Sequence, residues 1–366
     1  MKRIALLLAL CLIIIIFSAC SAEQEETISV ASFPQANFNN NYWFSGDFWA
    51  FDDTLFYLQD GFYNMGAYWS TNGNNYKLFE ESDFANDSTK YTVIGDIFVC
   101  DSYLYFELYT DDQEGWLYRY DLKESTYASV CEIPSLYRWV VVDNYFIYRE
   151  HPSNNDDNCS PLCIYNFGDN TTTQVCANVE EFGIVDGQLR YITNADAYEL
   201  YEYNYIEKQS TVLGKFYCEF DDACDIFNFT PDHIVMLSWS RDYYHNLVVY
   251  SLSSNSTAVY TLPKGIHNMV AYDQYAYAVV YDTQKNSSEA VAAEENGIYR
   301  INLTDGSYEV VESNASDNTE IHVTSDDCIY IVQRKMNILF QSRRHVYKFD
   351  YRTGSKEKLT VIMYPL

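Results

Sequence analysis

The sequence is poor in basic residues. Lysine and arginine together number 23, against 52 aspartates and glutamates, so the formal net charge at pH 7 is −29. Neutralising nucleic-acid phosphates requires clustered lysine and arginine, and electrostatic docking on anionic lipid requires the same charge. The composition therefore argues against a nucleic-acid-binding protein and against charge-driven attachment to a membrane surface.

Glycine and proline are also scarce, with 14 and 7 residues in a chain of 366. Collagen-like and linker-like chains contain far more of both. Hydrophobic residues make up 48% of the chain and aromatic residues 17%, including 36 tyrosines. That content is typical of a folded chain rather than a disordered one, despite the high charge.

Long apolar runs are absent except at the N-terminus. Residues 4–17 are uniformly apolar, follow two basic residues and precede the triplet 18–20, which reads Ser-Ala-Cys. A run of this length is a signal-peptide core and is short for a membrane span. Small residues before a cysteine resemble the bacterial lipobox, in which the chain is cut before the cysteine, here Cys20, and its thiol is lipidated. The alternative is an ordinary secreted protein that is cut after Ala22.

These features predict three segments. Residues 1–19 are a lipoprotein signal peptide, residues 20–42 are the lipidated Cys20 and a flexible polar tether, and residues 43–366 are a single domain. We expect an extracytoplasmic protein that contacts the bacterial membrane only through its N-terminal lipid.

The rest of the chain repeats one pattern. Short aromatic and β-branched runs meet at a turn that mostly begins with Asp, with a mean spacing of about 46 residues. Between these turns lies a second pattern: an aromatic residue or Ile, then Asp, Asn or Ser, then Leu, Phe or Tyr, as in Tyr120-Asp121-Leu122. The first set of turns falls at positions 52, 101, 143, 186, 231, 273 and 326.

Asp and Asn suit tight hairpins because they tolerate unusual backbone angles and bond their own main chain. Each unit therefore contains four strands, A to D, with tight A–B and C–D turns. A four-stranded antiparallel sheet repeated every 40–50 residues or so is typical of a β-propeller blade. The sequence predicts an all-β protein, a propeller of seven four-stranded blades; six or eight follow if the first unit is miscounted.

The chain also resembles a known family at this point. The lipobox, the tyrosine-rich units with an Asp-led turn and the strand Leu-Tyr-Arg-Tyr-Asp-Leu at 117–122 are similar to uncharacterised bacterial lipoproteins. Their propeller is compared with the low-density-lipoprotein-receptor-like and TolB-like propellers. The resemblance covers about residues 44–362 and implies a propeller in an extracytoplasmic location. It implies no catalytic residues.

The B–C loops vary in length and content, whereas the A–B and C–D turns are short. Variable loops on a rigid scaffold are where binding usually resides, so the face that carries the B–C loops is the expected site. Exposed rings beside carboxylates suit sugar stacking or capture of cationic ligands; the alternative is that the rings pack loop against loop. The candidate ligand-binding residues are Tyr68, Trp69, Asp111, Asp112, Trp116, Asp156, Asp157, Trp239, Tyr243 and Tyr244.

Metal and catalytic motifs are weak or missing. Residues 154–158 offer hard oxygen ligands that suit Ca²⁺, but they lack the spacing and the bidentate Glu of a known calcium loop, so a solvated acidic turn is favoured. The sequence contains no Gly-x-Ser-x-Gly elbow and no phosphate-binding glycine loop. We expect no cofactor, with calcium as the weaker alternative.

Ten cysteines are present, and eight remain once Cys11 has left with the signal peptide and Cys20 has been lipidated. Export permits disulfides, and an even number fits them. Cys163 and Cys176 flank one C–D turn and are expected to face each other, with Cys159 as a competitor for the same thiol. Cys218 and Cys224 bracket a short loop and form the second candidate pair.

Three functional hypotheses follow. The first is a surface lipoprotein that acts as a non-enzymatic binding module for a protein, peptide or glycan. The second is a polysaccharide-active hydrolase or lyase with carboxylates at the mouth of the propeller channel. The third is a structural component of an envelope complex. The fold alone does not decide among them, because propellers carry many functions.

Overall fold

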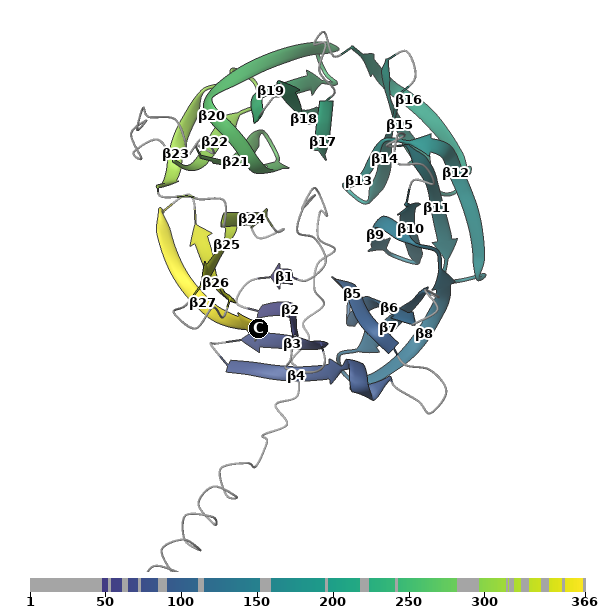
Figure 1. The fold of residues 1–366 in the computed structure, drawn as a ribbon. Helices are drawn as coiled ribbons and strands as arrows, with labels where there is room; N and C mark the ends of the chain where they lie inside the picture. Colours follow the sequence, from purple (N-terminus) through teal and green to yellow (C-terminus); the bar gives the residue numbers. More distant parts are fainter. Residues whose placement is uncertain are drawn as a thin grey trace, which may run out of the picture.

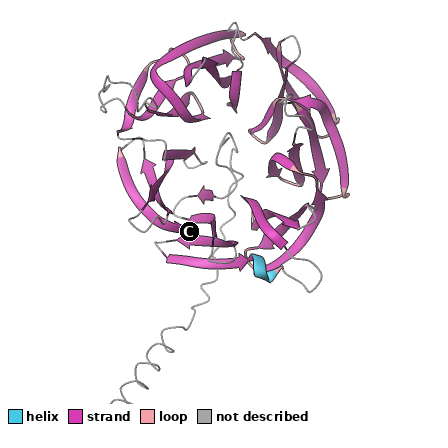
Figure 2. Ribbon diagram, in the orientation of Figure 1, coloured by secondary structure: helices cyan, strands magenta, loops and turns pink. Residues whose placement is uncertain are grey.

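The computed structural model describes residues 48–364 except 52–53, 61–64, 72–73, 85–90, 111–114, 152–158, 195–196, 218–223, 241–242, 282–295, 314, 316–318, 324–328, 337–341 and 351–352. These residues form seven antiparallel blades around a common centre (Figure 1). Strands dominate throughout, and one 3₁₀ turn, η1 (Glu81–Asp83), joins the first two blades (Figure 2). No helix within the described ranges is long and apolar enough to cross a membrane.

Each blade is built from strands that follow one another in the chain. Blade 1 contains β1 (Phe48–Phe51), β2 (Thr54–Asp60), β3 (Met65–Thr71) and β4 (Asn74–Glu80). Blade 2 contains β5 (Tyr91–Cys100), β6 (Tyr103–Thr110), β7 (Gly115–Asp121) and β8 (Thr126–Ile133). Blade 3 contains β9 (Leu136–Val142), β10 (Tyr145–Glu150), β11 (Ser160–Asn166) and β12 (Thr171–Val179). Blade 4 contains β13 (Glu181–Val185), β14 (Gln188–Asn194), β15 (Tyr198–Asn204) and β16 (Gln209–Phe216).

Blades 5 and 6 share a strand. Blade 5 contains β17 (Cys224–Phe229), β18 (His233–Ser240), β19 (Tyr243–Ser251) and the first part of β20 (Ser256–Tyr272), and blade 6 contains the rest of β20, β21 (Tyr275–Val280), β22 (Gly297–Asn302) and β23 (Tyr308–Ser313). Residues 256–261 of β20 pair with β19, and residues 266–272 pair with β21. Blade 7 contains β24 (Thr319–Val323), β25 (Ile329–Met336), β26 (Ser342–Asp350) and β27 (Ser355–Tyr364). The predicted architecture of seven four-stranded blades is confirmed.

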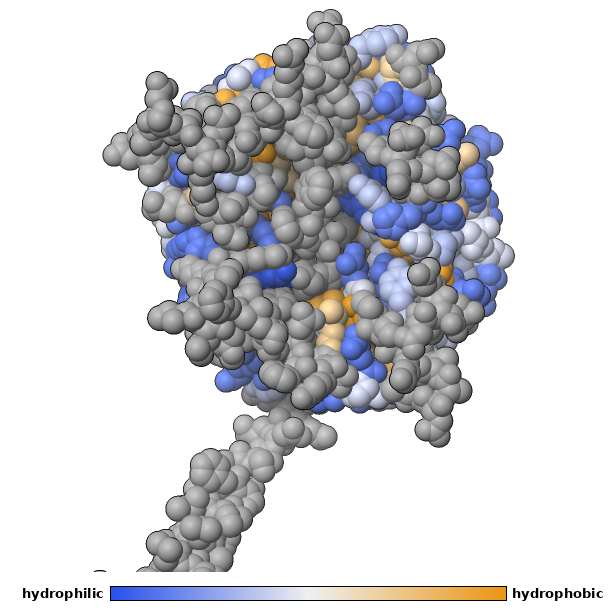
Figure 3. Space-filling view, in the orientation of Figure 1, coloured by the Kyte–Doolittle hydropathy of each residue, from blue (hydrophilic) through white to orange (hydrophobic). Residues whose placement is uncertain are grey.

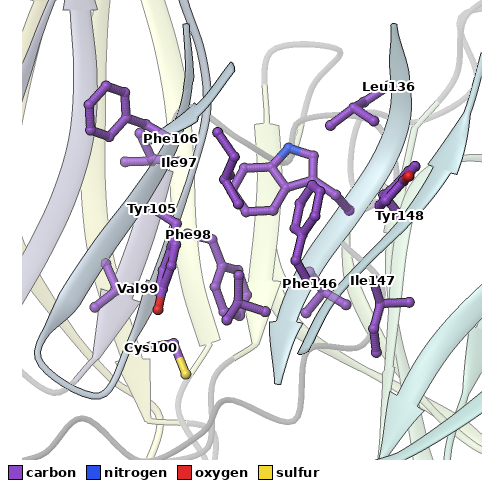
Figure 4. Close-up of a cluster of buried hydrophobic side chains, with 14 of the residues drawn as sticks. Ile97, Phe98, Val99, Cys100, Tyr105, Phe106, Leu136, Phe146, Ile147 and Tyr148 are labelled. Atoms are coloured by element: carbon purple, nitrogen blue, oxygen red, sulfur yellow. The ribbon is translucent and has the colours of Figure 1, made fainter. Parts of the chain in front are cut away.

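The core lies between neighbouring blades. The first strand of each blade stands nearest the centre and the last strand at the rim (Figure 1). Between blades 2 and 3, side chains of β5 and β6 meet those of β9 and β10 (Figure 4). The Phe98 ring, for example, lies 6.1 Å from the Trp139 ring of blade 3 and 6.5 Å from the Trp49 ring of blade 1. Both faces of a blade are therefore covered by its neighbours.

The A–B turns explain the repeated Asp. Four of them are two-residue hairpin turns in which the first residue has a positive φ of 50–55°. Asp and Asn adopt this left-handed conformation more readily than other residues with a side chain. The four residues are Asp101, Asp143, Asp186 and Asp273.

The C–D turns explain the second sequence pattern. Asp121 ends β7, and its Oδ1 accepts a hydrogen bond from the Lys123 backbone N–H at 2.9 Å; Asn302 binds the Thr304 N–H in the same way at 2.8 Å. The apolar residue that follows ties the two turns of a blade together, because the Leu122 N–H donates to the Ser102 carbonyl at 2.9 Å. The polar residue therefore caps the turn, as Asx residues do.

The ring closes through side chains. In the described residues, no strand of blade 7 joins the sheet of blade 1. Instead Leu55 and Tyr57 of β2 pack in one buried cluster with Tyr330, Val332 and Val346 of blade 7. Burial raises the pKa of Tyr57 well above its ordinary value.

The register of blade 3 differs from the expected one at its cysteines. A bulge in the β11–β12 pair places Cys163 opposite Gln174 and Cys176 opposite Leu162. Cys163 lies beside Tyr148, whereas Cys176 lies near Tyr191 of blade 4, and both thiols are free. The two residues do not face each other, because one extra residue turns Cys176 to the other side of the blade. Cys218 and the side chain of Cys224 lie outside the described residues.

The left-handed position of the C–D turn generates a stability prediction. Lys208 ends the turn of blade 4 with φ of 52°, where a residue with a Cβ is strained and glycine is not. Lys208→Gly should raise the free energy of unfolding by about 0.5–1 kcal/mol, measured by urea denaturation. The matched control is Lys123→Gly, also exposed in a C–D turn but without a positive φ, which should lower it by about 0.5 kcal/mol. A lower free energy of unfolding in both variants would contradict strain at Lys208.

Candidate functional site

The two faces of the ring differ. The A–B and C–D turns lie on one face, called here the turn-side face, and the B–C loops and D–A crossovers lie on the other, the loop-side face. On the face drawn in Figure 3, hydrophilic described residues border the centre of the ring. The loop-side face is the predicted binding face, and its described residues are the ones to compare with the candidates.

All six candidate rings lie in strands rather than in loops, and the side chains of three of them are described. Tyr68 and Trp69 belong to β3, and Trp116 belongs to β7. Trp69 is 7% exposed and stacks on Tyr76 at 4.7 Å between ring centroids, and Tyr68 stacks on Tyr57 at 5.7 Å. These two rings were expected on a B–C loop, but they belong to β3 and take part in blade packing.

The other candidates lie beyond what the structure describes in detail. The strands β18 and β19 contain Trp239, Tyr243 and Tyr244, but their side chains are not described. Asp111, Asp112, Asp156 and Asp157 lie outside the described residues, as do all of residues 154–158, which were named for calcium. Among the described residues, no group of three His, Cys, Asp or Glu side chains could hold a metal ion.

A feature that the sequence analysis missed lies on the inner strands. Four residues before the end of each inner strand from blade 2 to blade 7, the side chain is polar, although the neighbouring positions are mostly apolar. We call this set the inner tier. Its members are Asp96, Arg138, Glu181, Asp225, Asn268 and Thr319, at the loop-side half of β5, β9, β13, β17, β20 and β24.

The tier member of blade 2 faces a buried carboxyl group. Glu107 of β6 is 7% exposed and lies against the bulge that contains Asp96. Burial raises the pKa of Glu107 strongly, and the Asp96 carboxylate raises it further. A hydrogen bond with the Tyr109 hydroxyl opposes these effects only in part. Glu107 is therefore a carboxylic acid held neutral beside a second carboxyl group, the arrangement from which acid–base pairs are built.

Gly95 makes room for this acid. A Cβ at position 95 would collide with the Glu107 carboxylate, and the next nearest atoms are also those of Glu107. The glycine thus serves close approach of a side chain rather than a turn.

The tier members of blades 3 and 4 form a buried ion cluster. Arg138 Nη1 lies 3.1 Å from Glu181 Oε1, and Arg149 Nη1 lies 3.8 Å from Glu181 Oε2. The Arg149 guanidinium also donates to Ser160 Oγ at 2.9 Å and to the Glu180 carbonyl. Buried ion pairs of this kind cost desolvation and add little net stability, so the fold alone does not require them.

An aromatic surface covers this cluster. The Arg149 guanidinium carbon lies 4.4 Å from the centroid of the Tyr137 ring, and Tyr137 packs edge-on against His151 at 5.6 Å. Tyr137 is 37% exposed, and His151 is exposed as well. The loop-side face of blade 3 therefore presents a solvent-accessible ring directly on a buried cation.

Blade 7 carries a third polar group at the same end of the ring. Thr319, Glu320, His322 and Arg344 are all buried. Burial and, to a smaller extent, the Arg344 guanidinium lower the pKa of His322 to about 3, so the imidazole is neutral at physiological pH. Charged residues inside short apolar strands, such as Glu181 in Glu-Phe-Gly-Ile-Val, were the sequence signal for all three groups.

Comparison with known proteins gives the fold alone. No protein-family model matches this chain, and no curated protein matches it. Among solved structures, it is similar to a prolyl endopeptidase studied for inter-domain dynamics, with a TM-score of 0.60, 12% identity and coverage of 89% of this chain and 51% of that chain. It is also similar to oligopeptidase B from Leishmania major, with a TM-score of 0.55, 7% identity and coverage of 90% and 49%.

The third similarity is to a propeller domain. The β-propeller domain of the Trilobed protease from Pyrococcus furiosus, described as having an open velcro topology, gives a TM-score of 0.54, 10% identity and coverage of 89% and 96%. The chain spans about half the length of the two peptidases but nearly all of this domain. The propeller expected from the sequence is confirmed, whereas membership of the lipoprotein family stays a prediction.

The neutral carboxyl group generates a prediction of pH dependence. The pKa of Glu107 is raised in the folded state from its ordinary value of 4.5, so the unfolded state loses this proton at a lower pH than the folded state does. The free energy of unfolding is therefore unaffected below pH 4.5 and falls as pH rises from 4.5 toward the folded-state pKa. Glu107→Gln stays neutral, so its free energy of unfolding relative to the parent should rise between pH 4 and pH 7. Urea denaturation at several pH values measures this, with the exposed Glu124→Gln as control. Parallel profiles for parent and Glu107→Gln would contradict the prediction.

Proposed function

We propose that this protein is an extracytoplasmic lipoprotein whose propeller binds a protein, peptide or glycan partner on its loop-side face. The observation that supports the proposal best is the inner tier. Polar side chains occupy the same position of six inner strands, the neighbouring positions are mostly apolar, and two of the six, Arg138 and Glu181, are buried charges, which cost stability. Retaining them suggests a role other than holding the blades together.

The chemistry of the face indicates what it would bind. Tyr137 and His151 offer an exposed aromatic surface, and the Arg138–Glu181–Arg149 cluster beneath them fixes the Tyr137 ring through its contact with Arg149. A ring held in place loses little conformational entropy on binding, which is why such residues serve as anchors. A sugar ring or a peptide side chain is the matching partner.

The binding test compares two exposed tyrosines on opposite faces. Once a glycan or peptide ligand has been found by screening cell-wall glycans and peptides with the purified protein, Tyr137→Ala should weaken it by about tenfold or more, as loss of an anchor does. The control is Tyr308→Ala, which removes a ring of 49% exposure beside a C–D turn and should change affinity less than about twofold. Titration calorimetry measures both. An equal loss of affinity in both variants, or an affinity that neither variant changes, would show that the binding site lies elsewhere.

Attachment to the membrane is tested through Cys20. If this residue carries the lipid, Cys20→Ser should abolish incorporation of a fatty-acid label and move the protein from the membrane fraction to the soluble fraction. Cys11→Ser, which changes a thiol inside the expected signal peptide, should leave both unchanged. Labelling that persists in Cys20→Ser would refute lipidation at this residue.

A hydrolase or lyase is the second candidate function. The specific observation in its favour is Glu107, a carboxyl group that burial keeps protonated beside Asp96, since a proton donor next to a second carboxyl group suits acid–base chemistry. Peptidases are among the similar structures, but the likeness covers half their length. Turnover of a bound ligand that Glu107→Gln abolishes without weakening binding would support this candidate; binding without turnover would support the first.

A further inference from the structure

A small hollow opens between blades 3 and 4, which are neighbours in the ring (Figure 1). It lies at the turn-side face, opposite the face considered above, because its lining residues stand at or near the A–B turn of blade 3 and the C–D turns of both blades. Its volume is about 310 Å³ when the open mouth is included. Ligand sites begin at about this size, so the hollow has room for one small unit rather than a long chain. The lining includes Tyr145, Ile164, Thr173, Tyr203, Tyr205 and Lys208.

Two walls of the hollow carry hydroxyl groups that the protein does not use. Tyr203 is only 5% exposed, yet neither its hydroxyl nor that of Tyr145 hydrogen-bonds to another described residue. Burial raises the pKa of Tyr203, and the neighbouring Tyr145 raises it further, so the two hydroxyls lie close together. Polar groups of buried side chains normally have a partner. These two hydroxyls are therefore available to a ligand in the hollow.

The rings that carry these hydroxyls are held in place by other rings. Tyr145 stacks on Tyr205 with 4.7 Å between ring centroids, and Tyr203 packs edge-on against Tyr205 at 5.7 Å. Blade 3 supplies Tyr145 and blade 4 the other two, so the packing of the blades fixes the shape of the hollow. Tyrosine in such a setting offers a rigid surface with a polar tip and loses little conformational entropy on binding.

The C–D turn of blade 4 departs from the other C–D turns at two positions beside the hollow. Lys208 has φ of 52°, a left-handed conformation that strains a lysine. In five other blades the residues at this position are Ser125, Asn170, Asn255, Gly306 and Gly354. Ile206 is 93% exposed, at a position where four other blades have Lys123, Gly168, Ser253 and Thr304. A strained lysine and an exposed isoleucine add little to folding, so both are better explained by contact with a ligand.

The charges around the hollow disfavour an ionic ligand. The Lys208 ammonium lines the opening and repels a cation. Carboxylates surround it and repel an anion: Asp169 of blade 3 interacts electrostatically with Lys208. Asp143 of blade 3 interacts in the same way with Tyr205, and Glu207 adjoins Lys208 in the chain. A neutral molecule avoids both repulsions.

The ligand that these groups fit is neutral, small and rich in hydroxyl groups. The tyrosine hydroxyls can donate and accept, and the Lys208 ammonium donates, so the ligand must present both acceptors and donors at short spacing. The tyrosine rings and Ile206 match the C–H surface between such hydroxyls. We propose that the hollow between blades 3 and 4 binds one uncharged sugar unit through the hydroxyls of Tyr145 and Tyr203 and the ammonium of Lys208. This site is separate from the loop-side face and does not depend on the function proposed for that face.

The test pairs two small substitutions with the same changes elsewhere. In the site variant, Tyr203→Phe removes only a hydroxyl, and Lys208→Asn removes the ammonium but keeps a residue that tolerates the left-handed conformation. The control variant, Tyr308→Phe with Lys123→Asn, removes an exposed hydroxyl from blade 6 and an exposed ammonium from blade 2. Because the Tyr203 hydroxyl has no partner in the fold, the site variant should keep its urea midpoint. A markedly lower midpoint would show that the hydroxyl serves the fold and would overturn the proposal.

The probes are glucose, galactose and mannose, with glucosamine and glucuronate as charged relatives of glucose. Each is titrated into the full protein at millimolar concentrations and followed by NMR. At least one neutral sugar should bind, and both charged sugars should bind more weakly than it does. The site variant should weaken the neutral sugar by about tenfold, through loss of two hydrogen bonds, and the control variant by less than about twofold.

Three further results would overturn the proposal. The first is the absence of binding of all three neutral sugars at these concentrations. The second is tighter binding of glucosamine or glucuronate, which would show a site for an ion. The third is an equal loss of affinity in the site variant and the control variant. A loss in Tyr137→Ala but not in the site variant would likewise assign the sugar to the loop-side face instead of the hollow.

Discussion

A blade of this protein is a small sheet with two apolar faces, and neither can stay in water. Each face must be covered by another blade, so the sheets are stable only when they are stacked, and seven of them meet again in a ring. The last contact is made by side chains, with Leu55 and Tyr57 of blade 1 packed against blade 7. The positions that polar side chains can occupy also depend on this packing of each blade against its two neighbours.

The stacking leaves different freedom at the two ends of the inner strands. At the turn side, tight hairpins fix the backbone, and residues that tolerate a positive φ, such as Asp, Asn and Gly, are the most suitable. At the loop side, the inner tier lies close to the variable connections and can carry charge when a partner is at hand, as Arg138 does beside Glu181. The backbone therefore restricts the residue types at the turn side, whereas at the loop side each polar residue depends on its partner side chain.

Much of this architecture was readable from the sequence because turns repeat locally. Asp143-Asn144 or Asp186-Gly187 between β-branched runs predicts a hairpin without knowledge of the rest of the chain, and the spacing of such turns gives the blades. The candidate site was harder to predict. Tyr68 and Trp69 look like loop residues only if the strand is assumed to end early, and a single bulge in β12 was enough to turn Cys176 away from Cys163.

The inner tier was missed for a related reason. Asp96 and Arg138 belong to inner strands of different blades, and the groups that they face, Glu107 and Glu181, come from a neighbouring strand and from the next blade. Only alignment of the repeats by the ends of their inner strands shows that one position is polar in all six blades from blade 2 to blade 7. Burial and pKa then depend on packing between blades, which no local pattern encodes.

The shared strand β20 has a consequence for how the ring could have been assembled or could be cut. Six of the blade junctions, counting the closure, are not spanned by a shared strand, but blades 5 and 6 are joined by the single strand β20, whose residues 256–261 pair with β19 and whose residues 266–272 pair with β21. Chain ends introduced within β20 would disrupt two strands at once, the outermost strand of blade 5 and the innermost strand of blade 6. The pair therefore behaves as a double module, so circular permutation or exchange of repeats would have to respect that unit and open the ring at another junction.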